Sequence, residues 1–302
     1  MRSFCWGVMV LIGLHLLVSA PELASRDLKD ELGQHLTLPD NPRRVVCLAP
    51  SLTETVYALG GGAAVVGVTD YTDYPPEAQT KPSVGGLTDA SLEKIASLRP
   101  DLVLAMAEFN RQDTIEELEH VGIPVFVVDP RGLQGIMASI QHVGDALNRS
   151  GDARRLLKRL EEHRATAIAR VKGLPRRKVL VVVWCDPIIT AGGKSFINDV
   201  ISAAGGESIT ADLDQAYPQI SLEEVLRRPP DVILLVRGVH GGITRDDLKV
   251  HPGWDQLKAV KDNQVIYMGE QLFHPSPVVF DALQQLAKEL HPEAFQSGRD
   301  NP

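Results

Sequence analysis

A segment of this chain recurs at a constant distance of 130 residues, and this repeat limits the folds open to the chain (221 minus 91). Residues 91–104 contain SLEKI followed by RPDLVL, and residues 221–234 contain SLEEV followed by PPDVIL. Each copy is typical of a capping serine, a short helix with an acid in its first turn, a Pro-Asp break and a buried strand. The repeat therefore predicts two similarly built α/β lobes rather than one continuous sheet.

The rest of the chain alternates short β-branched runs with amphipathic stretches, which indicates parallel α/β architecture. Residues 152–171 place leucines and alanines on one face and Arg and Glu elsewhere, and Gly173 and Pro175 stop this helix. We predict two Rossmann-like α/β lobes, 40–145 and 177–292, joined by a single long rigid helix over 152–171. The predicted strands are 44–48, 65–68, 102–106, 124–128, 178–184, 231–236 and 264–268.

The N-terminus has the order of a secretory signal. Arg2 precedes an apolar run from Phe4 to Val18, and small residues follow it up to Ala20. We expect residues 1–20 to be a signal peptide and the mature protein to work in the periplasm, with retention of the segment as an anchor as the alternative. Cys5 precedes most of the apolar run, so it cannot accept a lipid at a cleavage site.

Charge and motifs exclude several functions. A net charge of -8 and a pI near 5.6 argue against a nucleic-acid partner. The sequence has no dinucleotide fingerprint, no Gly-x-Ser-x-Gly elbow, no His-Glu-x-x-His and no Cys-x-x-Cys. Gly193-Lys194-Ser195 lacks the earlier glycine of a phosphate loop, because Ile188 stands there. We expect no catalysis, no cofactor and no metal site, and two buried free thiols at Cys47 and Cys185. An extracytoplasmic metal or cofactor enzyme is the alternative from another functional class.

Three further segments carry a resemblance that covers essentially the whole mature chain. They are RVVCLAPSLTE at 44–54, GVTDYTDYPP at 67–76 and YPQIS at 217–221. With the signal and the two α/β halves, they make the chain resemble the substrate-binding proteins of iron-siderophore, haem and vitamin B12 importers, nearest to the cobalamin-binding branch. The resemblance implies two lobes joined by one rigid helix. It also implies a ligand held between the lobes and delivered to an ATP-driven importer.

The resemblance also implies which residues touch the ligand. It places Tyr71 and Tyr74 on one rim of the cleft and Trp184 and Tyr217 on the other. Aromatic rings with a polar tip suit the broad, amide-edged face of a corrin. The remaining predicted contacts are Pro50, Ser51, Arg237, Phe273 and His274.

One loop departs from the cobalamin-binding pattern. The chain has SVGGLT at 83–88, where the family carries an aromatic wall. This departure leaves two other ligands open. Haem could use Tyr71, Tyr217 or His274 as an iron ligand. A ferric siderophore would favour cleft cations, for which Arg237 is the candidate.

Glu93 and Glu223 occupy the same place in the two copies of the repeat. Each acid in a first helical turn stabilises the helix terminus by about 0.3–1 kcal/mol, which by itself explains a glutamate there. The resemblance implies more, namely that these two glutamates dock the lobes onto arginines of a two-subunit permease. We expect docking, with helix support as the alternative.

Overall fold

The computed structural model describes residues 24–236 and 244–296. Its first lobe, here called the N-lobe, contains a four-stranded parallel sheet in the order β4-β3-β5-β6. These strands are runs of Val and Leu with almost no exposed residue, as expected where helices cover both faces of a parallel sheet. The strands are β3 (Val45–Cys47), β4 (Val65–Gly67), β5 (Leu102–Met106) and β6 (Val125–Val128). The helices are α1 (Pro50–Ala58), α2 (Leu92–Ser97), α3 (Gln112–His120) and α4 (Gly132–Ala146), with 3-10 turns at Gly62–Ala64 and Pro76–Thr80.

The second lobe, the C-lobe, repeats this arrangement. Its parallel sheet has the order β10-β7-β12-β13, which matches the N-lobe order strand for strand. The strands are β7 (Arg177–Val182), β10 (Gly206–Ser208), β12 (Val232–Val236) and β13 (Val265–Met268). The helices are α6 (Phe196–Ala203), α7 (Leu222–Arg227), α8 (Arg245–Val250), α9 (Lys258–Lys261) and α10 (Val279–Leu290), with 3-10 turns at Trp254–Gln256, Glu270–Phe273 and Pro292–Phe295.

The 130-residue repeat is visible in the hydrogen bonds. The Ser91 hydroxyl accepts from the backbone N–H of Lys94 at 3.3 Å, and the Ser221 hydroxyl accepts from that of Glu224 at 3.2 Å. Asp101 accepts from the backbone N–H of Arg44 at 2.9 Å, and Asp231 accepts from that of Lys178 at 2.8 Å. Each aspartate thus ties the start of its own strand to the neighbouring strand. The same sequence unit makes the same local structure twice.

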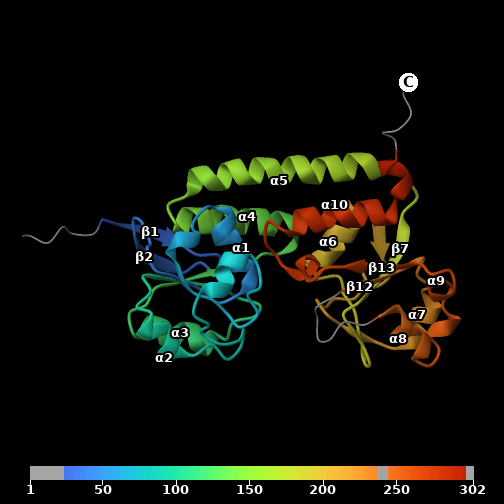
Figure 1. The fold of residues 1–302 in the computed structure, drawn as a ribbon, viewed down its shortest axis with the longest axis horizontal. Helices are drawn as coiled ribbons and strands as arrows, with labels where there is room; N and C mark the ends of the chain where they lie inside the picture. Colours follow the sequence, from blue (N-terminus) through green and yellow to red (C-terminus); the bar gives the residue numbers. More distant parts are fainter. Residues whose placement is uncertain (1–23, 237–243, 297–302) are drawn as a thin grey trace, which may run out of the picture.

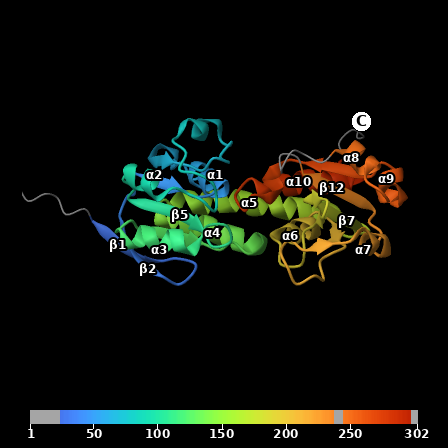
Figure 2. The ribbon, with the colours of Figure 1, turned by 90° about the horizontal axis from the view of Figure 1, so that it is seen from below.

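A single helix, α5 (Ser150–Val171), runs along both lobes. Its 22 residues span about 33 Å. In Figure 1 it lies above the two sheets, parallel to α4 of the N-lobe and α10 of the C-lobe, and Figure 2 shows it passing behind both lobes. One hydrophobic core continues through this layer, because Leu156 and Leu160 of α5 belong to the same buried cluster as Ile140 of α4 and Leu286 of α10. The lobes are therefore held by packed helices.

Two small antiparallel sheets complete the fold and are not part of the repeat. A hairpin of β1 (Ser25–Lys29) and β2 (His35–Pro39) precedes the N-lobe, and Arg26 donates to the carbonyls of Asp145 and Ala146 at the end of α4. In the C-lobe, β8 (Trp184–Cys185), β9 (Ile188–Ile189) and β11 (Gln219–Ile220) form the second sheet. Neither sheet was predicted; the strands of the second are only two residues long, which is too short for a periodic pattern.

The predicted free thiols are confirmed. Cys47 and Cys185 are both buried and unpaired, and burial raises the pKa of Cys47 to about 12 and that of Cys185 to about 11. Within 24–236 and 244–296, no helix combines the length and apolar character needed to cross a membrane. The predicted signal peptide, residues 1–20, lies outside the described residues.

Candidate ligand-binding cleft

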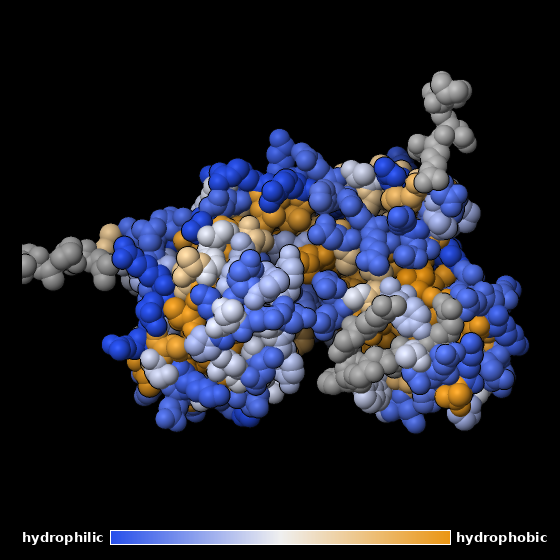
Figure 3. Space-filling view, viewed as in Figure 1, coloured by the Kyte–Doolittle hydropathy of each residue, from blue (hydrophilic) through white to orange (hydrophobic). Residues whose placement is uncertain are grey.

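A pocket of about 200 Å³ lies between the two lobes. Residues that follow β5 and β6 line it from the N-lobe, and the start of α6 and the loop before β11 line it from the C-lobe. The polar side chains around it are Glu108, Asp129, Arg131, Lys194, Ser195 and Tyr217. Ligands of open α/β sheets bind outside the carboxyl ends of the strands, which is where these residues stand. The pocket is smaller than most small-molecule sites, which measure about 300–1,000 Å³. Figure 3 shows a wider hollow between the lobes, and we take the pocket as one part of it.

Two aromatic residues line this pocket, Phe196 at the start of α6 and Tyr217 in the loop before β11. The ring of Tyr217 packs against Phe273 with centroids 6.3 Å apart and planes tilted by 39°. Burial raises the pKa of Tyr217 to about 12, although its hydrogen bond with Ser195 opposes the rise. The phenol therefore stays protonated near neutral pH, and Tyr217 offers a neutral, partly apolar surface.

Tyr71 belongs to the N-lobe, and 64% of its surface is exposed. It lies near Gly86, since a Cβ built on Gly86 would sit 3.5 Å from Cε2 of Tyr71. The same Cβ would sit 2.3 Å from a carboxylate oxygen of Asp89. Asp89 thus occupies the space that a side chain at position 86 would need.

Trp184 is brought near Tyr217 by the small sheet of the C-lobe. Ile189 of β9 pairs with Trp184 of β8 on one side and with Gln219 of β11 on the other. Trp184 therefore lies two strand spacings, about 10 Å, from the strand that follows Tyr217. Its side chain is 37% exposed, and its indole N–H donates to the carbonyl of Asp186 at 2.8 Å.

The other predicted contacts are placed differently. Tyr74, 50% exposed, lines a separate groove with α1, α5 and the start of α10, so the structure does not bring it into the pocket of Tyr217. Pro50 begins α1. Ser51 is buried, and its hydroxyl contacts Sδ of Met106 at 3.1 Å. Arg237 lies outside the described residues.

A buried carboxylate joins the two lobes next to the segment that follows Phe273. Glu54 of α1 is 3% exposed and accepts hydrogen bonds from two C-lobe side chains. Nδ1 of His274 lies 2.7 Å from one of its oxygens, and the Ser276 hydroxyl donates to the other. Because a buried carboxylate is costly without partners, this bridge fixes α1 against the segment before α10.

The surroundings of His274 favour its protonated form. Burial alone would lower its pKa, but hydrogen bonding to Glu54 and the charges of Glu54, Glu270 and Asp73 outweigh it, so the pKa is raised above 6.5. Glu270 itself has a raised pKa, through burial and then its hydrogen bond with Asp73. His274 thus lies among three carboxyl groups where the lobes meet, and their charges favour its protonated form.

This arrangement predicts a pH dependence of stability. A histidine with a raised pKa stabilises the folded protein fully below pH 6.5, and this contribution disappears as the pH rises through the higher folded-state value. We expect the unfolding midpoint of the parent to fall more between about pH 6 and about pH 8 than that of His274→Asn, because Asn can still donate to Glu54 without titrating. Differential scanning calorimetry measures this difference.

His163→Asn serves as the control for this prediction, because His163 pairs with Asp281 at the surface at 3.5 Å. In this variant the unfolding midpoint should fall with rising pH by as much as it does in the parent. If the unfolding midpoints of the parent and of His274→Asn fell equally over this pH range, the bridge between Glu54 and His274 would not titrate there.

The described part of the pocket is lined by two acids, Glu108 and Asp129, and two cations, Arg131 and Lys194. Glu108 has a raised pKa, because of burial and then the nearby Asp129. The two cations of the pocket are already paired, Arg131 with Asp129 at 2.8 Å and Lys194 with Asp214 at 3.0 Å. Across the described residues, no three His, Cys, Asp or Glu side chains gather in a way that could hold a metal ion. Both cations of the described pocket thus have an aspartate as partner, and Arg237 lies outside the described residues.

Sequence reasoning missed Glu54, Glu108, Arg131 and Lys194. Glu108 and Arg131 could have been found, because they follow the predicted strands 102–106 and 124–128, where cleft residues of parallel sheets lie. Glu54 lies inside α1, and only the packed lobes show that His274 and Ser276 reach it.

The chain matches the family model described as "Periplasmic binding protein" over residues 45–272. This range includes the parallel sheets of both lobes and ends just before Phe273 and His274. The chain belongs to the periplasmic binding protein family. Among its relatives, the vitamin B12-binding protein of Pectobacterium carotovorum subsp. carotovorum is 31% identical over 252 residues, which are 82% of this chain and 88% of that protein.

Solved structures of other periplasmic binding proteins have the same fold. The vitamin B12-binding protein BtuF of Vibrio cholerae superposes with a TM-score of 0.72 at 26% identity, over 85% of this chain and 99% of that one. The haem-binding protein RhuT of Roseiflexus sp. RS-1 superposes with a TM-score of 0.75 at 28% identity, over 83% and 99%. The two-lobed α/β fold predicted from the sequence is thereby confirmed, and these relatives are named as binding proteins and not as enzymes.

Proposed function

We propose that this periplasmic binding protein captures cobalamin or a related corrinoid between its lobes in the periplasm and delivers it to the permease of an ABC importer. The observation that carries the proposal is Tyr217, which lines the inter-lobe pocket and packs on Phe273; the exposed ring of Tyr71 is proposed as its counterpart on the N-lobe. Such rings can cover a broad apolar macrocycle, while Tyr and His tips donate to its amides. The vitamin B12-binding relatives support this ligand class.

The charges in the cleft support a corrinoid over a ferric siderophore. Among the described residues, the two cations of the pocket, Arg131 and Lys194, are each paired with an aspartate, which leaves Arg237, outside the described residues, as the remaining candidate for an anionic iron complex. A corrin edged with neutral amides needs hydrogen bonds only. Equilibrium dialysis against cyanocobalamin tests the proposal, and a micromolar or tighter Kd is expected. No binding at that level would contradict it.

Haem is the second candidate, because of His274 and the haem-binding relative. A carboxylate on Nδ1 holds the ring in a fixed orientation with Nε2 turned to other partners, as in many metal-ligating histidines. The raised pKa of His274 works against this role, because a protonated imidazole has no lone pair for iron. The same proton on Nε2 can be donated to an amide oxygen, which favours the corrinoid.

Docking on the permease is proposed through Glu93 and Glu223. Figure 1 shows α2 and α7, which carry them, on the side of the two sheets away from α5. Both glutamates are exposed, and both stand in the first turn of a serine-capped helix. A receptor with two equivalent lobes can place one carboxylate on each subunit of a twofold permease.

The packed helical layer predicts a small movement of the lobes on binding. Spin labels at cysteines placed at Ser97 and Arg227, equivalent residues of α2 and α7, should change their separation by less than about 2 Å on addition of cyanocobalamin. Cys47 and Cys185 are buried with raised pKa values, so they should not take the label. Pulsed electron resonance measures the separation. A change as large as that of strand-hinged binding proteins would contradict the rigid bridge.

A further inference from the structure

The outer faces of the two lobes carry different side chains, although the repeat builds them from equivalent helices. In the N-lobe, a groove of about 740 Å³ separates α2 from α3. Leu92 and Ala96 of α2 and Leu118 of α3 line it, together with Val121, which follows α3 and is 66% exposed. Ala96 corresponds to Leu226 in the C-lobe, so the smaller residue stands on the N-lobe side of the repeat. The N-lobe thus has an apolar groove beside its docking glutamate.

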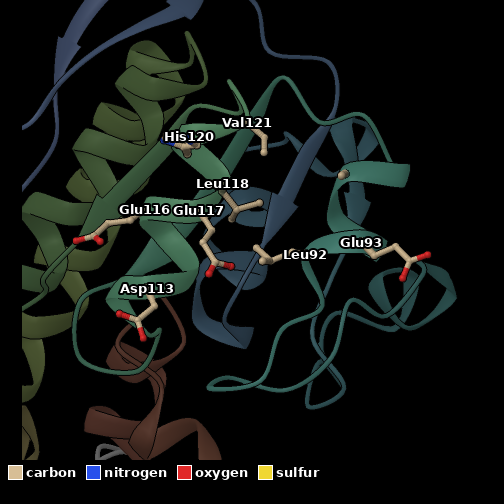
Figure 4. Close-up of a pocket in the computed structure, with 9 residues that line it drawn as sticks. Leu92, Glu93, Asp113, Glu116, Glu117, Leu118, His120 and Val121 are labelled. Atoms are coloured by element: carbon tan, nitrogen blue, oxygen red, sulfur yellow. The ribbon is translucent and has the colours of Figure 1, made fainter.

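Figure 4 shows how the side chains of this groove lie. Leu118 and Glu117 of α3 face Leu92 across the gap, and Glu93 extends from the other side of α2. Asp113 and Glu116 also line the groove, from α3. The apolar residues are therefore flanked by carboxylates on both helices.

These carboxylates are not neutralised within the described chain. No ion pair to Glu93, Glu116 or Glu117 occurs among the described residues, and Glu116 only accepts from the amide of Gln112 at 2.7 Å. In the C-lobe, by contrast, Glu224 beside Glu223 is paired with Arg227 and, at 2.6 Å, with Arg228. Among the described residues, three acids that line the groove on α2 and α3 thus have no ion pair, whereas α7 and α8 carry two such acids, Glu223 and Asp247.

We infer that the α2–α3 groove receives a segment of the importer's permease in which basic residues flank an apolar side chain, so that the N-lobe makes the broader of the two docking contacts. The inference rests on the proposed docking role and goes further, because it assigns different contacts to two lobes that the repeat makes alike. An apolar side chain would fill the space beside Ala96. Basic neighbours would pair with the acids at the rim, which fixes register more than it adds affinity.

Ala96→Leu tests the groove without changing charge. It copies the C-lobe residue at the equivalent exposed position, and leucine is a good helix former, so the fold should persist. Binding to the purified permease–ATPase complex in lipid nanodiscs should weaken by about tenfold, while affinity for cyanocobalamin stays that of the parent. Leu226→Ala is the matched control in the C-lobe and should bind the complex like the parent.

A second variant tests the charges. Glu116→Gln with Glu117→Gln should slow association with the same complex and reduce its salt dependence. Glu162→Gln with Glu289→Gln removes two exposed acids from α5 and α10 and should change neither. If Ala96→Leu and the Glu116/Glu117 variant both bind the complex like the parent, the groove does not receive a permease segment. This outcome would contradict the inference even if Glu93 and Glu223 are shown to contact the permease. Sedimentation showing that Ala96→Leu dissociates a dimer of this chain would instead assign the groove to a second copy and overturn the permease assignment.

Discussion

Glu93→Arg combined with Glu223→Arg should abolish the stimulation of transporter ATPase activity and leave the affinity for ligand unchanged. Each substitution turns an attractive contact with a basic permease residue into a repulsive one, and like charges in an interface cost several kcal/mol. The ligand cleft is made by other elements, so it should not respond. Proteoliposomes containing the cognate permease–ATPase complex, titrated with each receptor, measure the effect.

The control for this experiment reverses charge elsewhere. Glu162→Arg with Glu289→Arg changes two exposed residues on α5 and α10, on the opposite side of the molecule from α2 and α7. It should stimulate like the parent. If the Glu93/Glu223 variant also stimulates like the parent, the two glutamates serve only to stabilise their helices, an effect of about 0.3–1 kcal/mol each.

Tyr217→Ala should weaken cyanocobalamin binding by roughly five- to a hundredfold, which corresponds to about 1–3 kcal/mol. The substitution removes a ring that lines the inter-lobe pocket and packs on Phe273. Tyr217→Phe keeps the ring and loses only the hydroxyl near Ser195, so it should stay close to the parent. Calorimetric titration with cyanocobalamin measures both.

Tyr71→Ala should behave like Tyr217→Ala, because its exposed ring is proposed as the counterpart of Tyr217 on the N-lobe. Tyr74→Ala gives the comparison within the same loop, since Tyr74 lines the separate groove beside α5 and should matter less. Parent-like affinity of both Tyr71→Ala and Tyr217→Ala would show that the cleft is misplaced.

The fold was accessible from the sequence because its signals are local. Each copy of the repeat contains its own cap, helix, break and strand, and the predicted strand 102–106 coincides with β5. The strand predicted over 178–184 is divided, because β7 ends at Val182 and Trp184 begins β8 in a different sheet. No local pattern marks that change of sheet. The lobe boundaries at 40–145 and 177–292 stay predictions.

The site was less accessible, because its decisive contacts cross between the lobes. Glu54 and His274 are 220 residues apart along the chain and meet at 2.7 Å. Neither periodicity nor spacing can report such a contact. The aromatic residues were named through resemblance, and the structure gathers Tyr217 with Phe273 but places Tyr74 elsewhere.

The central claim is that the cleft holds a corrinoid. Its most direct test is the visible spectrum of the protein after incubation with cyanocobalamin or with haemin, followed by desalting. We expect the corrin bands to stay with the protein after cyanocobalamin and no Soret band to stay with it after haemin. A retained Soret band with no retained corrin absorption would contradict the claim and assign the cleft to haem.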